Sequence, residues 1–294
     1  MTRNNIYEIL VKFYPLKKGR TRWLNLVRAI LNIKNYNLYK KKSEGQFNLL
    51  LDPGDSNDLH YYFNWCGVSY KYLLQKFLNE GDTVVDVGVN IGFFSVIAAN
   101  IVRDKGHVYS IEASPKMINR LELVTNESKS KNITICHNAL WKDCSILTFN
   151  IATNSGWSSI IENPTFTIED KYEVNAITLD QFCKEYEVNK INFLKLDIEG
   201  AEFDALLGSI NTLNNKIIDL ILLEVEPHRL KAFNHSGSEI NKFLINLGYT
   251  AICTIINDKI YKITEKNKVP GEINSDYLYV RNELYNEKYN LLWK

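Results

Sequence analysis

Three carboxylates follow one another within the segment Leu194-Lys195-Leu196-Asp197-Ile198-Glu199-Gly200-Ala201-Glu202, directly after an apolar run. The helix dipole favours acidic side chains in the first turn of a helix, which would account for one or two of them. Three such groups close together repel one another unless a cation or a role in proton transfer compensates. Asp197 and Glu199 are therefore candidates for catalysis.

A glycine-containing segment, Asp86-Val87-Gly88-Val89-Asn90-Ile91-Gly92, follows another apolar run. Gly88 permits a tight turn, and Gly92 permits close packing of a helix. Asn90 stands where a dinucleotide-binding loop has its middle glycine. Asp86 would repel an anionic pyrophosphate and attract the cationic ammonium and sulfonium of S-adenosylmethionine (SAM). Charge thus favours SAM over a nicotinamide dinucleotide, and a glycine turn capped by Asp86 is the purely structural alternative.

Two further segments could hold the rest of such a ligand. Glu112 lies 20 residues after Gly92, where an acid can accept both ribose hydroxyls. Asn138 and the backbone of Ala139 could border the adenine. Each has a structural alternative: a surface carboxylate at a helix N-terminus for Glu112, and a loop beside a buried Trp141 for the second segment.

A fourth group of polar residues ends the segment Leu223-Glu224-Val225-Glu226-Pro227-His228. Strand alternation places Glu224 and Glu226 on one face. Asp197, Glu226 and His228 could then converge over a transferred methyl group. A surface loop histidine is the alternative for His228.

The surrounding pattern predicts an α/β protein. Short apolar runs at 83–87, 108–111, 133–136, 191–196 and 217–225 alternate with helical patterns. Such units form a parallel sheet with helices on both faces, and ligands bind beyond the carboxyl ends of its strands. The last two strands, at 249–256 and 277–280, have no helix between them, so the final strand is expected to be antiparallel.

One segment departs from this pattern, and two capping boxes mark the starts of helices within it. Residues 145–177 alternate in polarity, which favours an antiparallel insertion. The segments Thr178-Leu179-Asp180-Gln181 and Ser236-Gly237-Ser238-Glu239 are capping boxes that predict helix starts.

Composition narrows the class of protein. The chain has 294 residues, 45% hydrophobic content and a formal net charge of +1, which does not suit a binder of polyanions. Its five cysteines show no paired spacing, so neither a disulfide scaffold nor a zinc site is expected. With no evident signal peptide and no run of about 20 apolar residues, the cytosol is the default compartment.

The N-terminal residues 1–60 are expected to form a basic, mainly helical extension, irregular from residue 34 onward. It could pack on the main domain with solvated lysines, or contact an anionic membrane, a lipid-linked substrate or a partner enzyme. Residues 1–42 hold one acid, Glu8, and the following bases: Arg3, Lys12, Lys17, Lys18, Arg20, Arg22, Arg28, Lys34, Lys40, Lys41 and Lys42.

Together these motifs resemble the FkbM-type methyltransferases over about residues 66–256. The resemblance rests most specifically on the acidic segment at 197–202, and further on 86–92, Glu112-Ala113-Ser114-Pro115, Asn138-Ala139, Ser155-Gly156 with Ser158, and Thr178-Leu179-Asp180. Val89 and Ala113-Ser114 depart from the usual family residues without removing a carboxylate or a required glycine.

This resemblance implies a Rossmann-like, seven-stranded class I methyltransferase domain at 61–294, with SAM as methyl donor. It further implies O-methylation of a sugar, a glycan or a small secondary metabolite. The residues expected to bind SAM are Asp86, Gly88, Asn90, Gly92, Phe93, Glu112, Ala113, Asn138, Ala139 and Asp197.

A hydroxyl is a weak nucleophile and needs a base or a metal ion. One hypothesis makes Asp197 or His228 the base, with Glu199 and Glu226 orienting it. The other places Mg²⁺ on Asp197, Glu199 and Glu226, because hard oxygen ligands suit that ion.

Other functions fit the sequence less well. A non-catalytic SAM-binding scaffold would have no need of acids at each strand end, and an NAD(P)-dependent oxidoreductase is disfavoured by Asp86. A nucleic-acid partner is not expected, because the basic residues gather in the N-terminal extension without aromatic stacking positions near the acidic motifs.

Overall fold

The computed structural model describes residues 9–10, 19, 22–23, 26–27, 30, 40–52, 55–128, 131–152, 158–160, 168–264 and 274–293. Most of the basic segment 1–42 lies outside these ranges, so its helices and its contacts stay predictions. Within these ranges, no helix combines the length and the apolar character needed to cross a membrane.

A mixed sheet of eight strands forms the centre of the protein, in the order β12-β11-β13-β10-β9-β3-β4-β5. The neighbours among β3, β4, β5, β9 and β10 pair in parallel, and β13 runs antiparallel to both β10 and β11. This confirms the predicted parallel units and the antiparallel final strand. The strands are β3 (Thr83–Val87), β4 (His107–Glu112), β5 (Ile133–His137), β9 (Ile191–Leu196), β10 (Ile218–Val225), β11 (Tyr249–Ile256), β12 (Lys259–Lys262) and β13 (Ser275–Arg281).

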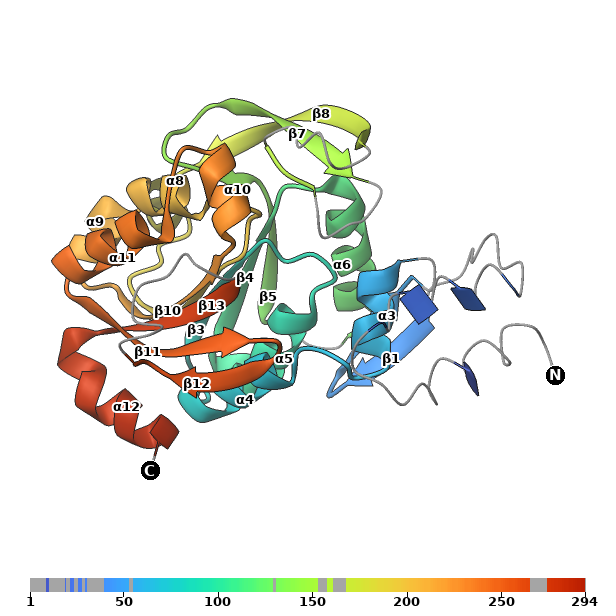
Figure 1. The fold of residues 1–294 in the computed structure, drawn as a ribbon, viewed down its shortest axis with the longest axis horizontal. Coiled ribbons are helices and arrows are strands. Elements are labelled where there is room, and N and C mark those ends of the chain that lie inside the picture. Colours follow the sequence, from blue (N-terminus) through green and yellow to red (C-terminus); the bar gives the residue numbers. More distant parts are fainter. Residues whose placement is uncertain are drawn as a thin grey trace.

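Helices cover both faces of this sheet, as Figure 1 shows. Alternation along each strand sends successive side chains to opposite faces; Val84 packs on one side and Val85 on the other. The first face is covered by α4 (Val68–Phe77), α5 (Phe93–Val102), α6 (Pro115–Glu127) and α12 (Tyr285–Trp293). The second is covered by α7 (Leu179–Glu185), α8 (Glu202–Leu207), α9 (Ile210–Asn214), α10 (Pro227–Ala232) and α11 (Gly237–Asn246).

The sheet has one strand more than the seven expected. Strand β12 pairs with β11 through a two-residue turn in which Asn257 and Asp258 have φ of 51° and 58°. Positive φ at both central residues is the geometry of a tight hairpin turn. The strand is short and lies at the edge of the sheet. Its sequence, Lys259-Ile260-Tyr261-Lys262, is mostly exposed and therefore lacks the apolar pattern by which the buried strands were predicted.

The antiparallel insertion is confirmed. Strands β7 (Ile146–Ala152) and β8 (Ile168–Ile177) pair antiparallel, and the short β6 (Ala139–Leu140) adds to β8 in parallel. They lie together at one end of the molecule, with α12 at the other (Figure 1). Both capping boxes are also confirmed, because Thr178 accepts from the N–H of Gln181 and Ser236 from that of Glu239. Ser155-Gly156 lies outside the described residues.

The segment expected to be irregular contains a hairpin of β1 (Lys40–Glu44) and β2 (Phe47–Leu51), followed by α3 (Ser56–Tyr62). Phe47 and Leu49 are buried in the same core as the main sheet. Asp58 of α3 forms a buried ion pair with Arg120 of α6, whose guanidinium also donates to the carbonyl of Leu50. The hairpin was missed because its apolar run is short and follows a row of lysines.

We expect Arg120→Ala to lower the free energy of unfolding by about 3–5 kcal/mol, since it leaves the Asp58 carboxylate buried without its cation. Chemical denaturation measures this change. Lys41→Ala is the matched control: it breaks an exposed pair with Glu127 and should cost about 1 kcal/mol or less. Equal effects of the two substitutions would contradict this account of the hairpin.

Candidate active site

The loop after β3 has the tight geometry that its glycines predict. Gly88 has a φ of 77°, and a Cβ there would lie 1.8 Å from the carbonyl oxygen of Asp197. Asn90 also has a positive φ, of 50°, which asparagine tolerates better than most residues. The loop after β3 and the loop after β9 therefore touch through the glycine.

Glu112, at the end of β4, is fixed against this loop. Its Oε2 accepts the N–H of Asn90 at 2.9 Å, and its Oε1 accepts the N–H of Ser114 at 2.8 Å. Burial raises the pKa of the Glu112 carboxyl, and the backbone N–H groups act in the opposite direction. The carboxyl is held rigidly, with lone pairs left over for a ligand.

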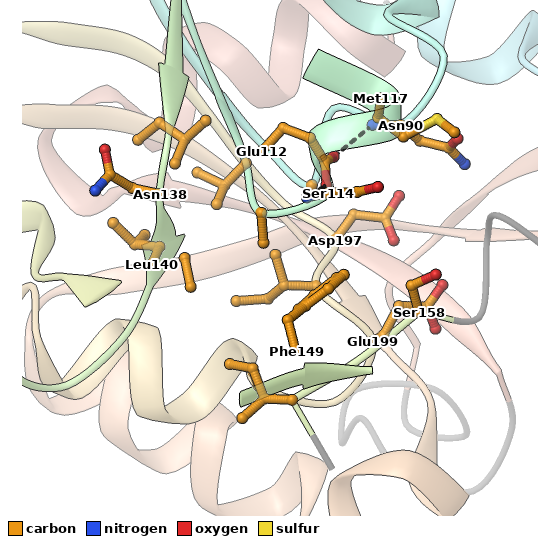
Figure 2. Close-up of a pocket in the computed structure, with 18 residues that line it drawn as sticks. Asn90, Glu112, Ser114, Met117, Asn138, Leu140, Phe149, Ser158, Asp197 and Glu199 are labelled. Atoms are coloured by element: carbon orange, nitrogen blue, oxygen red, sulfur yellow. Dashed lines mark hydrogen bonds between the residues drawn. The ribbon is translucent and has the colours of Figure 1, made fainter. Parts of the chain in front are cut away.

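A cavity opens beside these residues. In Figure 2, Asn138 and Leu140 lie at one side of it and Asp197 and Glu199 at the other. We call this cavity the donor pocket. Its lining residues are Val87, Gly88, Asn90, Ile111, Glu112, Ala113, Ser114, Met117, Asn138, Ala139, Leu140, Phe149, Ser158, Ile160, Asp197, Ile198, Glu199 and Ala201.

Most residues expected to bind SAM lie in this lining, and three do not. Asp86 is fully buried beneath the loop, where it accepts a hydrogen bond from Ser95 at 2.6 Å. Gly92 packs against Leu121 of α6. Phe93 stacks near Tyr61, with ring centroids 4.6 Å apart. Those within the lining are Gly88, Asn90, Glu112, Ala113, Asn138, Ala139 and Asp197.

The pocket also has apolar walls that sequence reasoning missed. Met117 comes from α6, Phe149 from β7, and Ile160 from the segment between β7 and β8. The alternating pattern of residues 145–177 predicted the insertion itself. It contained no signal that Phe149 closes a ligand pocket.

A buried lysine sits between two carboxylates of the site. The Nζ atom of Lys195 lies 2.9 Å from Asp197 and 3.6 Å from Asp86. Lys195 and Asp86 are register partners on the neighbouring strands β9 and β3. The charge of Asp86 is thus directed at this lysine, which corrects the expectation that Asp86 attracts SAM directly.

This lysine sets the protonation of its neighbours. Burial alone would lower the pKa of Lys195, but Asp197 and Asp86 raise it above its ordinary value. Burial acts to raise the pKa of Asp197, and the ammonium of Lys195 outweighs it and holds that pKa below the usual range. The pKa of Glu224 is raised well above its usual value by burial and by the charge of Asp197. Lys195 thus favours the ionised form of Asp197, and burial beside Asp197 favours the protonated form of Glu224.

The other acids of the motif have separate partners. Glu199 forms an ion pair with Arg229 of α10. Glu202 accepts the N–H groups of Ile198 and Gly200 at 3.0 and 3.1 Å, which fixes the loop after β9. The repulsion expected among Asp197, Glu199 and Glu202 is therefore relieved by a lysine, an arginine and two backbone N–H groups.

Two predicted catalytic residues lie elsewhere. Glu226 caps α10, where it pairs with Arg229 and accepts from the side chain of Asn274. His228 is exposed on α10, and it is absent from the lining of the donor pocket. The predicted alternation fails here because β10 ends at Val225, before Glu226.

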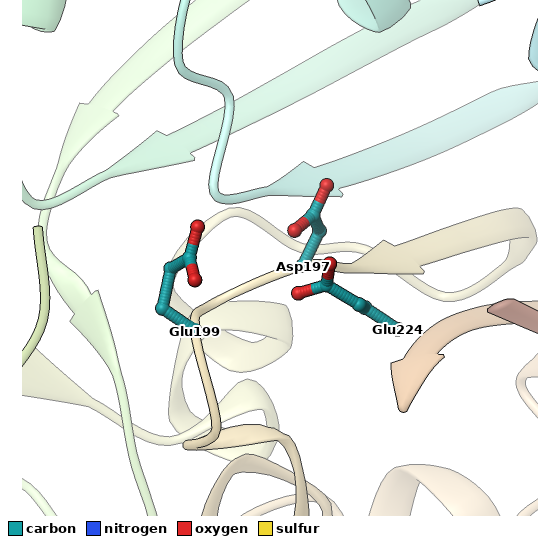
Figure 3. Close-up of side chains that lie close together, drawn as sticks. All are labelled: Asp197, Glu199 and Glu224. Atoms are coloured by element: carbon teal, nitrogen blue, oxygen red, sulfur yellow. The ribbon is translucent and has the colours of Figure 1, made fainter. Parts of the chain in front are cut away.

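Glu224 takes the place expected of Glu226. One carboxylate oxygen from each of Asp197, Glu199 and Glu224 lies within 4.8 Å of the others. Figure 3 shows these three carboxyl groups facing one another from the ends of β9 and β10. We call them the carboxylate cluster.

The residues of the donor pocket fit SAM. The Oδ1 atom of Asn90 is buried in the lining and has no hydrogen-bond partner among the described residues. Glu112 is held where a carboxyl can accept from ribose hydroxyls, and Asp197 supplies a negative charge for a cationic ligand.

Comparison with known proteins identifies the protein family. The methyltransferase FkbM domain matches residues 86–251 of the chain. The chain belongs to the FkbM methyltransferase family. The resemblance inferred from the motifs is therefore confirmed, and the oxidoreductase alternative is set aside.

One relative of this FkbM methyltransferase is the hexuronic acid methyltransferase AglP of Haloferax volcanii, with 27% identity over 160 residues. The match covers 52% of this chain and 59% of AglP. Among solved structures, a SAM-dependent methyltransferase from Aquifex aeolicus has 15% identity and a TM-score of 0.42, covering 72% of this chain and 89% of its own. Aeropyrum pernix fibrillarin with bound SAM has 13% identity and a TM-score of 0.40, covering 72% and 76%.

We expect Gly88→Ala to weaken binding of S-adenosylhomocysteine, the demethylated product, by at least about 100-fold, because the added Cβ would push the loops after β3 and β9 apart. Isothermal titration calorimetry measures the affinity. Gly81→Ala is the control: Gly81 also has a positive φ, of 95°, but a Cβ there meets nothing within 4 Å. It should cost about 1–2 kcal/mol of stability and leave the affinity unchanged. Retained affinity in Gly88→Ala would contradict the pocket assignment.

Proposed function

We propose that this FkbM methyltransferase transfers the methyl group of SAM to a hydroxyl of a sugar or glycan precursor. The observation that carries the proposal is the carboxylate of Asp197, which lies in the donor pocket lining, within 4.8 Å of the Glu224 carboxyl and 2.9 Å from the ammonium of Lys195. The relationship to a hexuronic acid methyltransferase supports a sugar acceptor over a small secondary metabolite.

The proposed orientation of the donor follows from the polarity of its pocket. The adenine would lie toward Asn138, Leu140 and the ring of Phe149, which form the apolar side. Its ribose would lie at Glu112, and the charged methionine end would lie toward Asp197. In this orientation the sulfonium reaches Asp197, whereas Glu199 in the same lining is paired with Arg229.

SAM supplies an electrophilic methyl group. In the transfer, the bond from sulfur to the methyl carbon breaks, its electron pair stays on sulfur, and the acceptor oxygen bonds to the carbon. Asp197 would hold the acceptor hydroxyl in line by accepting its hydrogen bond, and would receive its proton as the new bond forms. Lys195 keeps Asp197 ionised before the reaction.

The carboxylate cluster does not fit a resident Mg²⁺ well. Its oxygen atoms are close enough to share an ion, and hard oxygen ligands suit Mg²⁺. However, Asp197 already pairs with Lys195 and Glu199 with Arg229, and burial raises the pKa of Glu224. A dication would have to approach two cations and bind a carboxyl whose protonated form is favoured, so we propose a metal-independent transfer.

Asp197→Asn should lower kcat by about 10²- to 10⁴-fold, the usual contribution of a positioned base. The assay is transfer of isotope-labelled methyl from SAM to extracted glycans and lipid-linked sugars, with the product identified by mass spectrometry. Asp170→Asn, an exposed carboxylate of β8 outside the donor pocket, is the matched control. Full activity in Asp197→Asn would show that this carboxylate takes no part in the reaction.

Turnover should be unchanged, within about twofold, after treatment with EDTA, and added Mg²⁺ should not increase it. The physical reason is that Lys195 and Arg229 already neutralise the cluster. A loss of activity with EDTA that Mg²⁺ restores would contradict the metal-independent mechanism, and would favour the Mg²⁺ hypothesis.

A further inference from the structure

A second cavity, of about 720 Å³, lies on the α4 side of the carboxylate cluster. It is bounded by α3 and α4, by the end of β10, by the turn between β11 and β12, and by the start of β13. Its lining residues are Tyr61, Cys66, Gly67, Ser69, Tyr70, Glu224, Ile255, Asn257, Asp258, Asn274, Ser275 and Asp276.

This cavity adjoins the donor pocket at the carboxylate cluster. Glu224 lines the second cavity, whereas Asp197 and Glu199 line the donor pocket, and their oxygen atoms lie within 4.8 Å of one another. The Oε2 atom of Glu224 is buried and lacks a hydrogen-bond partner in the described part of the chain. Methyl transfer requires the acceptor oxygen about 3 Å from the methyl carbon, so an acceptor must bind next to this cluster.

Carboxyl groups dominate the wall of this cavity. Glu224 and Asp276 are directly opposite each other on the antiparallel strands β10 and β13. Asp276 accepts from the hydroxyl of Tyr70 at 2.7 Å, a neutral partner. Asp258 instead accepts the N–H groups of Val68 and Ser69 at the start of α4, so its charge is engaged there.

No cation balances these acids from within the lining. The described lining residues include no lysine, arginine or histidine. The nearby Lys195 is held by Asp86 and Asp197, and Lys42 donates to the carbonyl of Tyr61 and pairs with Glu44. A carboxylate placed in the cavity would therefore lose its hydration without gaining a positive partner.

We propose that the second cavity is the acceptor site, and that Glu224 and Asp276 make it select sugar hydroxyls on residues without a carboxylate, rejecting hexuronic acids. This inference rests on the proposed sugar methylation. It distinguishes the acceptor of this protein from that of its relative AglP, a hexuronic acid methyltransferase. From here on we call this cavity the acceptor cavity.

The test compares matched pairs of sugars that differ only in oxidation at C6: the nitrophenyl glycosides of glucose and glucuronate, galactose and galacturonate, and mannose and mannuronate. Transfer of labelled methyl from SAM gives kcat/KM for each. We expect at least one neutral glycoside to react, with kcat/KM at least tenfold above that of its hexuronate partner. Equal or faster transfer to a hexuronate would overturn the inference and leave the proposed sugar methylation standing.

Transfer to none of the six glycosides, by protein that still binds S-adenosylhomocysteine, would instead count against the proposed sugar methylation, and the inference would fall with it. The two failures are thus distinguishable.

The variant Asp276→Asn removes negative charge from the cavity at nearly constant volume. It should narrow the preference for the neutral sugar over its hexuronate partner at least threefold. Glu287→Gln, an exposed residue of α12 outside the acceptor cavity, removes the same charge elsewhere and should leave the preference unchanged. Binding of S-adenosylhomocysteine within twofold of the wild type shows that each variant is folded. An unaltered preference in Asp276→Asn would overturn the inference.

The preference for the neutral sugar over its hexuronate partner should also increase with pH. Burial and the charge of Asp197 raise the pKa of Asp276 to about 7, so this group is largely neutral at pH 6 and largely anionic at pH 8. The charged or titratable groups around it include Tyr61 of α3, Tyr70 of α4, Lys195 of β9 with Asp197 directly after it, Glu224 of β10, Cys253 of β11, and Asp258 beyond β11. Hexuronates stay ionised throughout this range, so the preference should be larger at pH 8 than at pH 6 in the wild type. A preference that does not increase between these pH values would contradict the role of Asp276, and Asp276→Asn should abolish the increase.

Discussion

The ammonium of Lys195, buried between Asp86 and Asp197, is the interaction on which the active site depends. Two carboxylates can be ionised this close together, away from water, only when a cation compensates them. The parallel register of β3 and β9 provides that cation by placing Lys195 opposite Asp86. The lysine therefore links β3, the first strand of the main sheet in chain order, to the acidic loop after β9.

The acids of the 197–202 motif have different roles because each has a different partner. Lys195 keeps Asp197 ionised, and Arg229 pairs with Glu199. The carboxylate of Glu202 accepts hydrogen bonds from backbone N–H groups of the loop after β9 and so holds that loop in place. In Glu224, from the neighbouring strand, burial and the charge of Asp197 favour the protonated form of the carboxyl. The carboxylate cluster thus lies between the donor pocket and the acceptor cavity.

Much of the fold and of the donor pocket could be predicted from the sequence. The strands at 83–87 and 191–196 are continuous apolar runs, and Gly88, Asn90 and Glu112 follow such strands directly. The edge of a parallel sheet brings together residues that follow its strands. Their position in the pocket therefore follows from local patterns, without knowledge of distant contacts.

The errors concern interactions that depend on strand register or on where a strand stops. The partner of Asp86 is Lys195, which is distant in sequence and was counted only as part of a strand. Glu226 was preferred to Glu224 because the alternation of strand side chains was extended to Glu226, one residue beyond the predicted run, and this residue stands at the N-cap of α10. Phe149 reaches the pocket through the fold of an insertion whose tertiary contacts no local pattern specifies.

The role of Lys195 is tested most directly by calorimetric titration of the Lys195→Met variant with S-adenosylhomocysteine. Removing the ammonium should cause Asp86 or Asp197 to take up a proton, which distorts the contact between the loops after β3 and β9. The account predicts an affinity at least tenfold weaker than that of the wild type, in protein with an unchanged circular dichroism spectrum. An affinity within twofold of the wild type would contradict it.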